Sequence, residues 1–124
     1  PQYELYITSN GLADTQMKRL QVTGLAPYFK GIFVSENTGY QKPMKQFFDY
    51  VFNHIPNFDL NKALIIGDSY SADIIGGARA GIDTCWLNPM YIAPPQSIVP
   101  TYEISRLDQL LSIIKNESHL KSTV

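Results

Sequence analysis

One stretch of the chain, residues 63–78, limits the fold more than any other. It reads ALIIGDSYSADIIGGA: the apolar run 63–66 predicts a buried strand, a Gly-Asp-Ser turn ends that strand, and 73–80 predicts a helix. Asp68 and Asp73 therefore follow the carboxyl end of a strand, where open α/β sheets place their binding sites. The pattern predicts a metal-ion site at this edge of the sheet.

The rest of the chain alternates strand patterns with helix patterns. Apolar residues recur at helical spacing from Met44 to Ile55, with Pro43 expected at the first helical position and Lys42 at the helix N-terminus. The alternation predicts an α/β fold, a doubly wound and mainly parallel sheet with helices on both faces. Strands are predicted at 4–9, 31–35, 63–66, 83–87 and 102–104, helices at 14–24, 43–55, 73–80 and 107–114, loops at 36–41 and 88–100, and a polar, frayed tail at 116–124.

Composition excludes several classes of partner. The 124 residues suffice for a single domain, and the net charge of −1 gives no electrostatic reason to expect nucleic acid or an anionic membrane. No apolar run approaches the length that spans a membrane, and the first residues do not resemble a secretory leader. The single cysteine, Cys85, has apolar neighbours and is expected to be a buried structural thiol. A cytoplasmic setting is the expectation.

Polar residues at the predicted strand ends form one set: Ser9, Asn10, Lys42, Asp68 and Asp73, with Ser69 beside them. The carboxyl ends of parallel strands meet at one edge of a sheet, so these side chains are expected to converge. Two carboxylates can hold Mg²⁺, a hydroxyl and an amide can donate to phosphoryl oxygens, and a lysine neutralises charge. The set favours a phosphorylated ligand.

Each member also has a structural interpretation. The turn after 63–66 could be only a turn, Asp73 only an N-cap, and the Ser-Asn-Gly sequence at 9–11 only turn chemistry. Lys42 could be a solvated surface charge. Tyr40 and Tyr70 could line a substrate pocket or simply pack. No catalytic role is predicted for either histidine.

The order of the motifs is more specific than their members. ITSNG at 7–11, Lys42-Pro43, and GDSYSADI at 67–74 resemble the second, third and fourth motifs of the haloacid dehalogenase (HAD) superfamily of hydrolases, and the resemblance covers about 5–88. The segment GIDTCWLNP at 81–89 resembles the noncanonical pyrimidine 5′-nucleotidases of that superfamily. The resemblance implies a Rossmann-like core.

The resemblance also implies roles for the site residues. Ser9 would bind the transferring phosphoryl group with Asn10 beside it, and Lys42 would stabilise the charge on the nucleophile and phosphate. Asp68 would ligate Mg²⁺ directly, and Asp73 would ligate it or hold its water shell. Because phosphoryl transfer needs Mg²⁺ whereas metal-free dehalogenation has no use for paired metal-binding acids, the acid pair favours a phosphatase over a dehalogenase.

One family motif is missing from this chain. The superfamily carries its nucleophile and its general acid/base on a first strand as Asp-x-Asp, and that pattern occurs nowhere here. The resemblance implies that this strand, which would lie in the centre of the sheet between 4–9 and 63–66, and any cap domain lie upstream. Two strand edges would then be unpaired. We expect the chain to pair with a missing N-terminal segment or a second copy, or to rearrange, and to be inactive alone.

The sequence thus favours the C-terminal part of a Mg²⁺-dependent phosphohydrolase that acts through an aspartyl-phosphate on a small phosphorylated substrate, such as a nucleoside 5′-monophosphate. Two alternatives remain open at this stage. One is a non-catalytic module that binds phosphate and metal, and the other is a haloacid dehalogenase.

Overall fold

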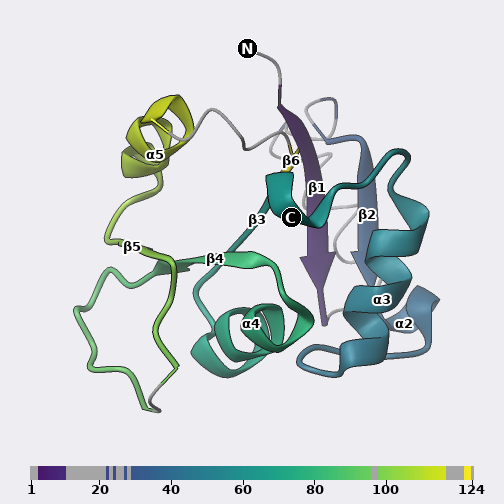
Figure 1. The fold of residues 1–124 in the computed structure, drawn as a ribbon, viewed down its shortest axis with the longest axis horizontal. Coiled ribbons are helices and arrows are strands. Elements are labelled where there is room, and N and C mark those ends of the chain that lie inside the picture. The colour runs from purple at the N-terminus through teal and green to yellow at the C-terminus, as the bar shows by residue number, and fades with distance from the viewer. Residues whose placement is uncertain are drawn as a thin grey trace.

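The computed structural model describes residues 3–10, 22, 24, 27, 29–95, 98–116 and 122–123. In these residues strands alternate with helices, as Figure 1 shows. The strands are β1 (Glu4–Ser9), β2 (Gly31–Val34), β3 (Ala63–Gly67), β4 (Asp83–Leu87), β5 (Tyr102–Ile104) and β6 (Ser122–Thr123). The helices are α2 (Ser35–Thr38), α3 (Lys45–His54), α4 (Gly76–Ala80) and α5 (Leu110–Asn116). Two 3₁₀ turns lie at Leu60–Lys62 and Leu107–Gln109, and a π-helical segment, η3, lies at Tyr70–Ile75.

The six strands form one sheet in the order β2-β1-β6-β3-β4-β5, and every described pairing is parallel. The predicted α/β class, with its mainly parallel sheet, is confirmed. Strand β6 lies between β1 and β3, but within the described residues it pairs with only two residues of each, Glu4–Leu5 and Ala63–Leu64. The edges of β1 and β3 are therefore not both unpaired, because β6 pairs with the first residues of each; this rearrangement is one of the three expected outcomes.

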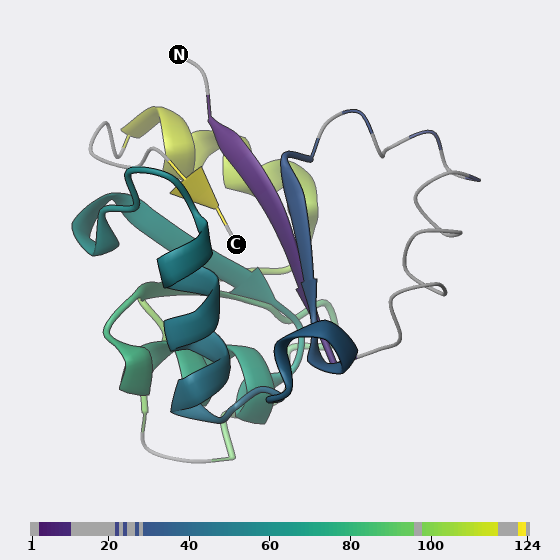
Figure 2. The same ribbon diagram turned by 90° about the vertical axis from the view of Figure 1, so that its right-hand side faces the viewer.

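Helices cover both faces of the sheet, as predicted. Along β3 the side chains alternate between the faces, so that Ala63 and Ile65 pack with α3 while Leu64 packs with β4, β5 and α5. Figure 2 shows α3 and α5 on opposite sides of the sheet. The α3 face consists of Phe47, Phe48, Val51 and Ile55, all buried. The predicted apolar stripe is therefore core at these four positions, whereas Met44 at its start is exposed and Phe52 is half-buried. The buried part of the stripe anchors the segment that carries Lys42.

Two predicted boundaries near Lys42 are wrong. The segment 36–41 is not all loop, because α2 covers Ser35–Thr38 and is capped by Gly39, whose φ of 81° is the left-handed conformation that glycine favours. Helix α3 begins at Lys45 instead of at Pro43. The carbonyl of Lys42 accepts a hydrogen bond from the Asn10 side chain and so does not begin the helical ladder. Lys42 consequently lies in a turn before the helix.

Two further predictions need correction. The helix predicted at 73–80 begins earlier, at Tyr70, because the Ser69 hydroxyl caps it by accepting from the Ala72 N–H at 3.2 Å. In the tail, Ser122 and Thr123 are paired in the sheet, contrary to the frayed segment expected there, whereas 117–121 and 124 lie outside the described residues. Of the helix predicted at 14–24, only Val22 and Gly24 are described. In the described part of the chain, no helix is long and apolar enough to cross a membrane.

Cys85 is expected to resist alkylation in the folded protein. The side chain is fully buried in a cluster with Leu64 and Ile104, and this burial raises the pKa of the thiol to about 11. The reactive thiolate is therefore scarce at about pH 8. Peptide mass spectrometry after iodoacetamide treatment should find Cys85 unmodified in buffer and modified in concentrated guanidinium chloride, and rapid labelling in buffer would contradict its burial.

Candidate active site

The predicted polar set lies in one cavity at the carboxyl ends of β1 and β3. The cavity has a volume of about 370 Å³, and its lining includes Ser9, Asn10, Lys42, Asp68 and Asp73. The structure thus brings together all five residues that the motif order singles out. They come from three separate parts of the chain, which the parallel sheet aligns.

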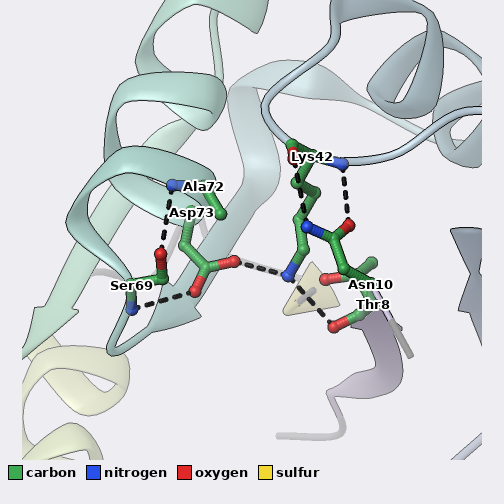
Figure 3. A network of polar contacts seen from close by, with 6 residues as sticks. All are labelled: Thr8, Asn10, Lys42, Ser69, Ala72 and Asp73. Carbon is green, nitrogen blue, oxygen red and sulfur yellow. Dashed lines mark hydrogen bonds and ion pairs between the residues drawn. The ribbon is translucent and has the colours of Figure 1, made fainter.

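Lys42 is a buried cation at the centre of this site. Its side chain is 8% exposed, and its Nζ lies 2.5 Å from Oδ1 of Asp73, whose side chain is also 8% exposed. Nζ also donates to the Thr8 carbonyl at 3.2 Å (Figure 3). The interpretation of Lys42 as a solvated surface charge is therefore wrong.

The Asp73 carboxylate is held by the first turn of η3. Its Oδ2 accepts from the Ser69 N–H at 3.3 Å, while Oδ1 pairs with Lys42. Gly67 at the end of β3 leaves room for this carboxylate, because a Cβ there would overlap Oδ2 and Cγ of Asp73. Asp73 is therefore not an N-cap, since Ser69 takes that part.

The side-chain amide of Asn10 forms two hydrogen bonds with the main chain of Lys42. Oδ1 accepts from the Lys42 N–H at 2.8 Å, and Nδ2 donates to the Lys42 carbonyl at 3.0 Å (Figure 3). The Asn10 carbonyl in turn accepts from the Ser35 hydroxyl at 3.0 Å. The amide thereby joins the end of β1 to the turn that precedes α3.

The Asp68 side chain is exposed, and a contact with Trp86 of β4 holds the turn in which Asp68 lies. The Trp86 indole N–H donates to the Asp68 carbonyl at 3.2 Å, and the Trp86 ring packs edge-on against Tyr70 with centroids 4.8 Å apart. Tyr70 is buried and donates its hydroxyl proton to the Ile98 carbonyl. Of the two tyrosine interpretations, packing is therefore right for Tyr70. Tyr40 is 42% exposed and lines a separate cavity with Ser35 and Met44.

Three contributors were not singled out from sequence. Thr8 acts through its carbonyl, a group that every residue carries, so no sequence signal marks it. Ser35 donates a hydroxyl to Asn10 but reads as an ordinary strand end. Gly67 had a usable signal, because a glycine at a strand end beside a carboxylate often permits close approach. Neither histidine joins the site: His54 is exposed at the end of α3, and His119 lies outside the described residues.

The donor set suits Mg²⁺. Asp68 and Asp73 offer hard carboxylate oxygens, and Mg²⁺ is commonly bound by one or two carboxylates with waters and substrate phosphate completing six ligands. In the described ranges, no cluster of three or more His, Cys, Asp or Glu side chains could hold a metal unaided. The residues therefore fit an ion shared with a ligand or with further protein, and not a closed structural site.

Three proteins illustrate what this chain is similar to. The crystal structure of the HAD-hydrolase YfnB from Bacillus subtilis, bound to magnesium, matches 91% of this chain with a TM-score of 0.88 and 56% identity, and the match covers 50% of that chain. The pyrimidine 5′-nucleotidase PynA of Streptococcus pneumoniae is 42% identical over 90% of this chain and 47% of its own length. The pyrimidine 5′-nucleotidase YjjG of Escherichia coli is 40% identical over 87% of this chain and 48% of its own length.

The chain thus spans about half the length of each of these relatives. The family described as haloacid dehalogenase-like hydrolase matches residues 1–87. That match includes all three motifs that form the polar cavity. The chain belongs to the haloacid dehalogenase-like hydrolase family.

Proposed function

We propose that the complete protein is a Mg²⁺-dependent phosphohydrolase whose substrates are small phosphate monoesters of the nucleoside 5′-monophosphate class. The observation that carries the proposal is the buried Lys42 cation, held by Asp73 in a polar cavity at the strand ends. A cation fixed in such a place can stabilise charge on a phosphoryl group without first reorganising. The buried pair gives the site a preformed electrostatic centre.

The residues divide the work by their chemistry. The Ser9 hydroxyl would donate to a phosphoryl oxygen, and Lys42 would neutralise charge on the phosphate and on the attacking group. Asp68 and Asp73 would hold Mg²⁺, which when bound offsets charge on the phosphoryl oxygens. That Asn10 binds phosphate stays a prediction, and its contacts with Lys42 suggest another role, developed below.

The nucleophile would come from protein outside this chain. In the family pattern an aspartate attacks phosphorus to form an aspartyl-phosphate, which water then hydrolyses. An apolar cavity of about 420 Å³, with Leu5, Ile7, Ile66 and Leu110 in its lining, lies along β1 and β3 beyond the short pairing of β6, where a further strand would enter the sheet. We propose that an N-terminal segment of the complete protein, or else a second copy, completes the sheet there. Without it the chain is expected to be inactive.

The substrate class rests on likeness. PynA and YjjG are named pyrimidine 5′-nucleotidases, and each aligns with most of this chain. The polar cavity is assigned to the phosphate group, so the expected preference for pyrimidine nucleotides rests on this likeness alone. The cytoplasmic setting likewise stays a prediction.

The experiment is an assay of the full-length protein on a panel of nucleoside 5′-monophosphates, with Mg²⁺ and with excess chelator. Phosphate release that requires Mg²⁺ is expected. Asp68→Asn should lower kcat at least about 100-fold, because one metal ligand loses its charge. Phosphate release should be highest with pyrimidine nucleotides.

Asp49→Asn is the matched control. Asp49 is an exposed carboxylate on α3 whose ion pair with Lys45 lies at the surface. The activity of the Asp49→Asn variant should therefore equal that of the wild type. Full activity in Asp68→Asn would contradict the metal assignment. Halide release from a haloacid without metal would support the dehalogenase alternative, and phosphate binding without turnover would support the non-catalytic module.

A further inference from the structure

We propose that Asn10 is a positioning residue, which acts on the reaction by fixing the main chain of Lys42. The proposal rests on the proposed phosphohydrolase function and adds Asn10 as a residue that affects the reaction only through Lys42. It departs from the expectation that Asn10 contacts phosphate.

The geometry of the amide carries the inference. Oδ1 and Nδ2 of Asn10 bond to the N–H and the carbonyl of one residue, Lys42, at 2.8 and 3.0 Å. This paired contact spans 32 positions of sequence and satisfies both polar groups of the Lys42 main chain. The acceptor oxygen of the amide is thereby already used, and so is one of its two N–H donors.

Both ends of Lys42 are thus tied to the same strand end. Its main chain is bound to Asn10, and its Nζ is bound to the carbonyl of Thr8, two residues earlier. A lysine side chain has several rotatable bonds, so fixing its Cα narrows the positions that Nζ can take. The Ser35 hydroxyl fixes the Asn10 carbonyl in the same way. The result is a chain of contacts from Ser35 at the start of α2 through Asn10 to the Lys42 cation.

A positioning role and a direct phosphate contact predict different effects on kcat when Asn10 and Lys42 are changed together. If Asn10 acts only through Lys42, its removal has little further effect once the lysine side chain is gone, because neighbouring sites in one network are not additive. If Asn10 binds phosphate itself, the two losses multiply. A double-mutant cycle on kcat therefore separates the two roles.

The cycle uses full-length protein, with p-nitrophenyl phosphate as the probe, and compares the wild type, Asn10→Ala, Lys42→Ala and the double variant. Asn10→Ala should lower kcat about 30-fold with KM changed less than about threefold, since a displacement of about 1 Å at a reacting group can cost about 100-fold. In the Lys42→Ala background the same change should cost less than about threefold. An undiminished effect in that background overturns the proposal.

Two other variants sharpen the result. Asn10→Asp keeps the acceptor for the Lys42 N–H but loses the donor, so kcat should be intermediate with KM near that of the wild type; a large rise in KM would instead indicate that the side chain meets phosphate. Asn53→Ala, at an exposed position of α3, is the matched control and should leave kcat and KM unchanged. If Asn10→Ala fails to fold, Ser35→Ala replaces it in the cycle, with a loss of about threefold in kcat that should also vanish in the Lys42→Ala background.

A readout independent of activity separates this inference from the proposed function. The Lys42 amide hydrogen is bonded to Oδ1 of Asn10, so its exchange with solvent should accelerate at least about tenfold in Asn10→Ala and not in Asn53→Ala. Unchanged exchange would overturn the inference even in an active enzyme. Accelerated exchange in a protein that hydrolyses no phosphate ester would overturn the proposed function and leave the contact intact.

Discussion

Replacing Lys42 with methionine is expected to lower the free energy of unfolding of the full-length protein by about 3–5 kcal/mol, because the change leaves a buried carboxylate without its counter-ion. Lys42 and Asp73 are each 8% exposed, so water replaces the lost partner only in part. The Ser69 N–H that remains on Asp73 is a single donor. Urea denaturation at neutral pH measures the difference. We expect kcat on nucleoside monophosphates to fall at least about 100-fold as well.

Lys45→Met is the matched control for this experiment. Lys45 pairs with Asp49 at 3.2 Å, but the side chains are 68% and 49% exposed, and such a pair contributes less than about 0.5 kcal/mol. A double change, Lys42→Met with Asp73→Leu, should recover part of the stability but none of the activity, because an apolar pair removes the unpaired charge. Equal and small losses of stability in Lys42→Met and Lys45→Met would contradict the burial of the ion pair.

Gly67→Ala is expected to disable the site from the strand side. The added methyl would occupy the position of the Asp73 carboxylate, which must then leave Lys42 and the Ser69 N–H. The combined overlap and loss of pairing should cost about 3 kcal/mol of unfolding free energy. The Mg²⁺ concentration that gives half-maximal activity should rise about tenfold or more, because the carboxylate no longer points into the cavity.

Gly81→Ala separates this effect from the general cost of losing a glycine. Gly81 ends α4 with a φ of 89°, so alanine there is strained by about 1 kcal/mol, but the residue does not line the polar cavity. Its Mg²⁺ requirement should match that of the wild type. A Gly67→Ala protein with normal Mg²⁺ dependence would show that Asp73 has another position from which to serve the ion.

The strands were the most predictable part of the fold. The ranges 4–9, 83–87 and 102–104 match β1, β4 and β5, because short runs rich in β-branched and aromatic residues and bounded by turn residues favour strands. The α3 stripe was predictable for the same reason. In both cases the periodicity of the side chains carried the information.

The errors arose where side chains far apart in sequence decide local structure. The start of α3 moves to Lys45 because Asn10, 32 residues before Lys42, takes the Lys42 carbonyl. The start of η3 is a different case, because its cap is the local contact between the Ser69 hydroxyl and the Ala72 N–H, while only the turn of Asp73 toward Lys42 is a long-range contact. The pairing of Ser122–Thr123 depends on a gap in the sheet, which no local pattern reports.

The candidate site was predictable in its membership but not in its internal contacts. Motif order named Ser9, Asn10, Lys42, Asp68 and Asp73, and all five line one cavity. The contacts among them depend on main-chain groups such as the Thr8 carbonyl and the Ser69 N–H, which are present at every such position of a chain. Only a folded backbone distinguishes them.

Position 8 is also a suitable site for attaching a spectroscopic label to this protein. Thr8 serves Lys42 through its carbonyl alone, so its side chain can be exchanged without deleting that contact. Together with Ile66 it lines both the polar cavity and the apolar cavity between β1 and β3. A fluorescent or spin label introduced at Thr8 would therefore sit on the partition between the two, and its spectrum could register strand insertion on one side and ligand arrival on the other.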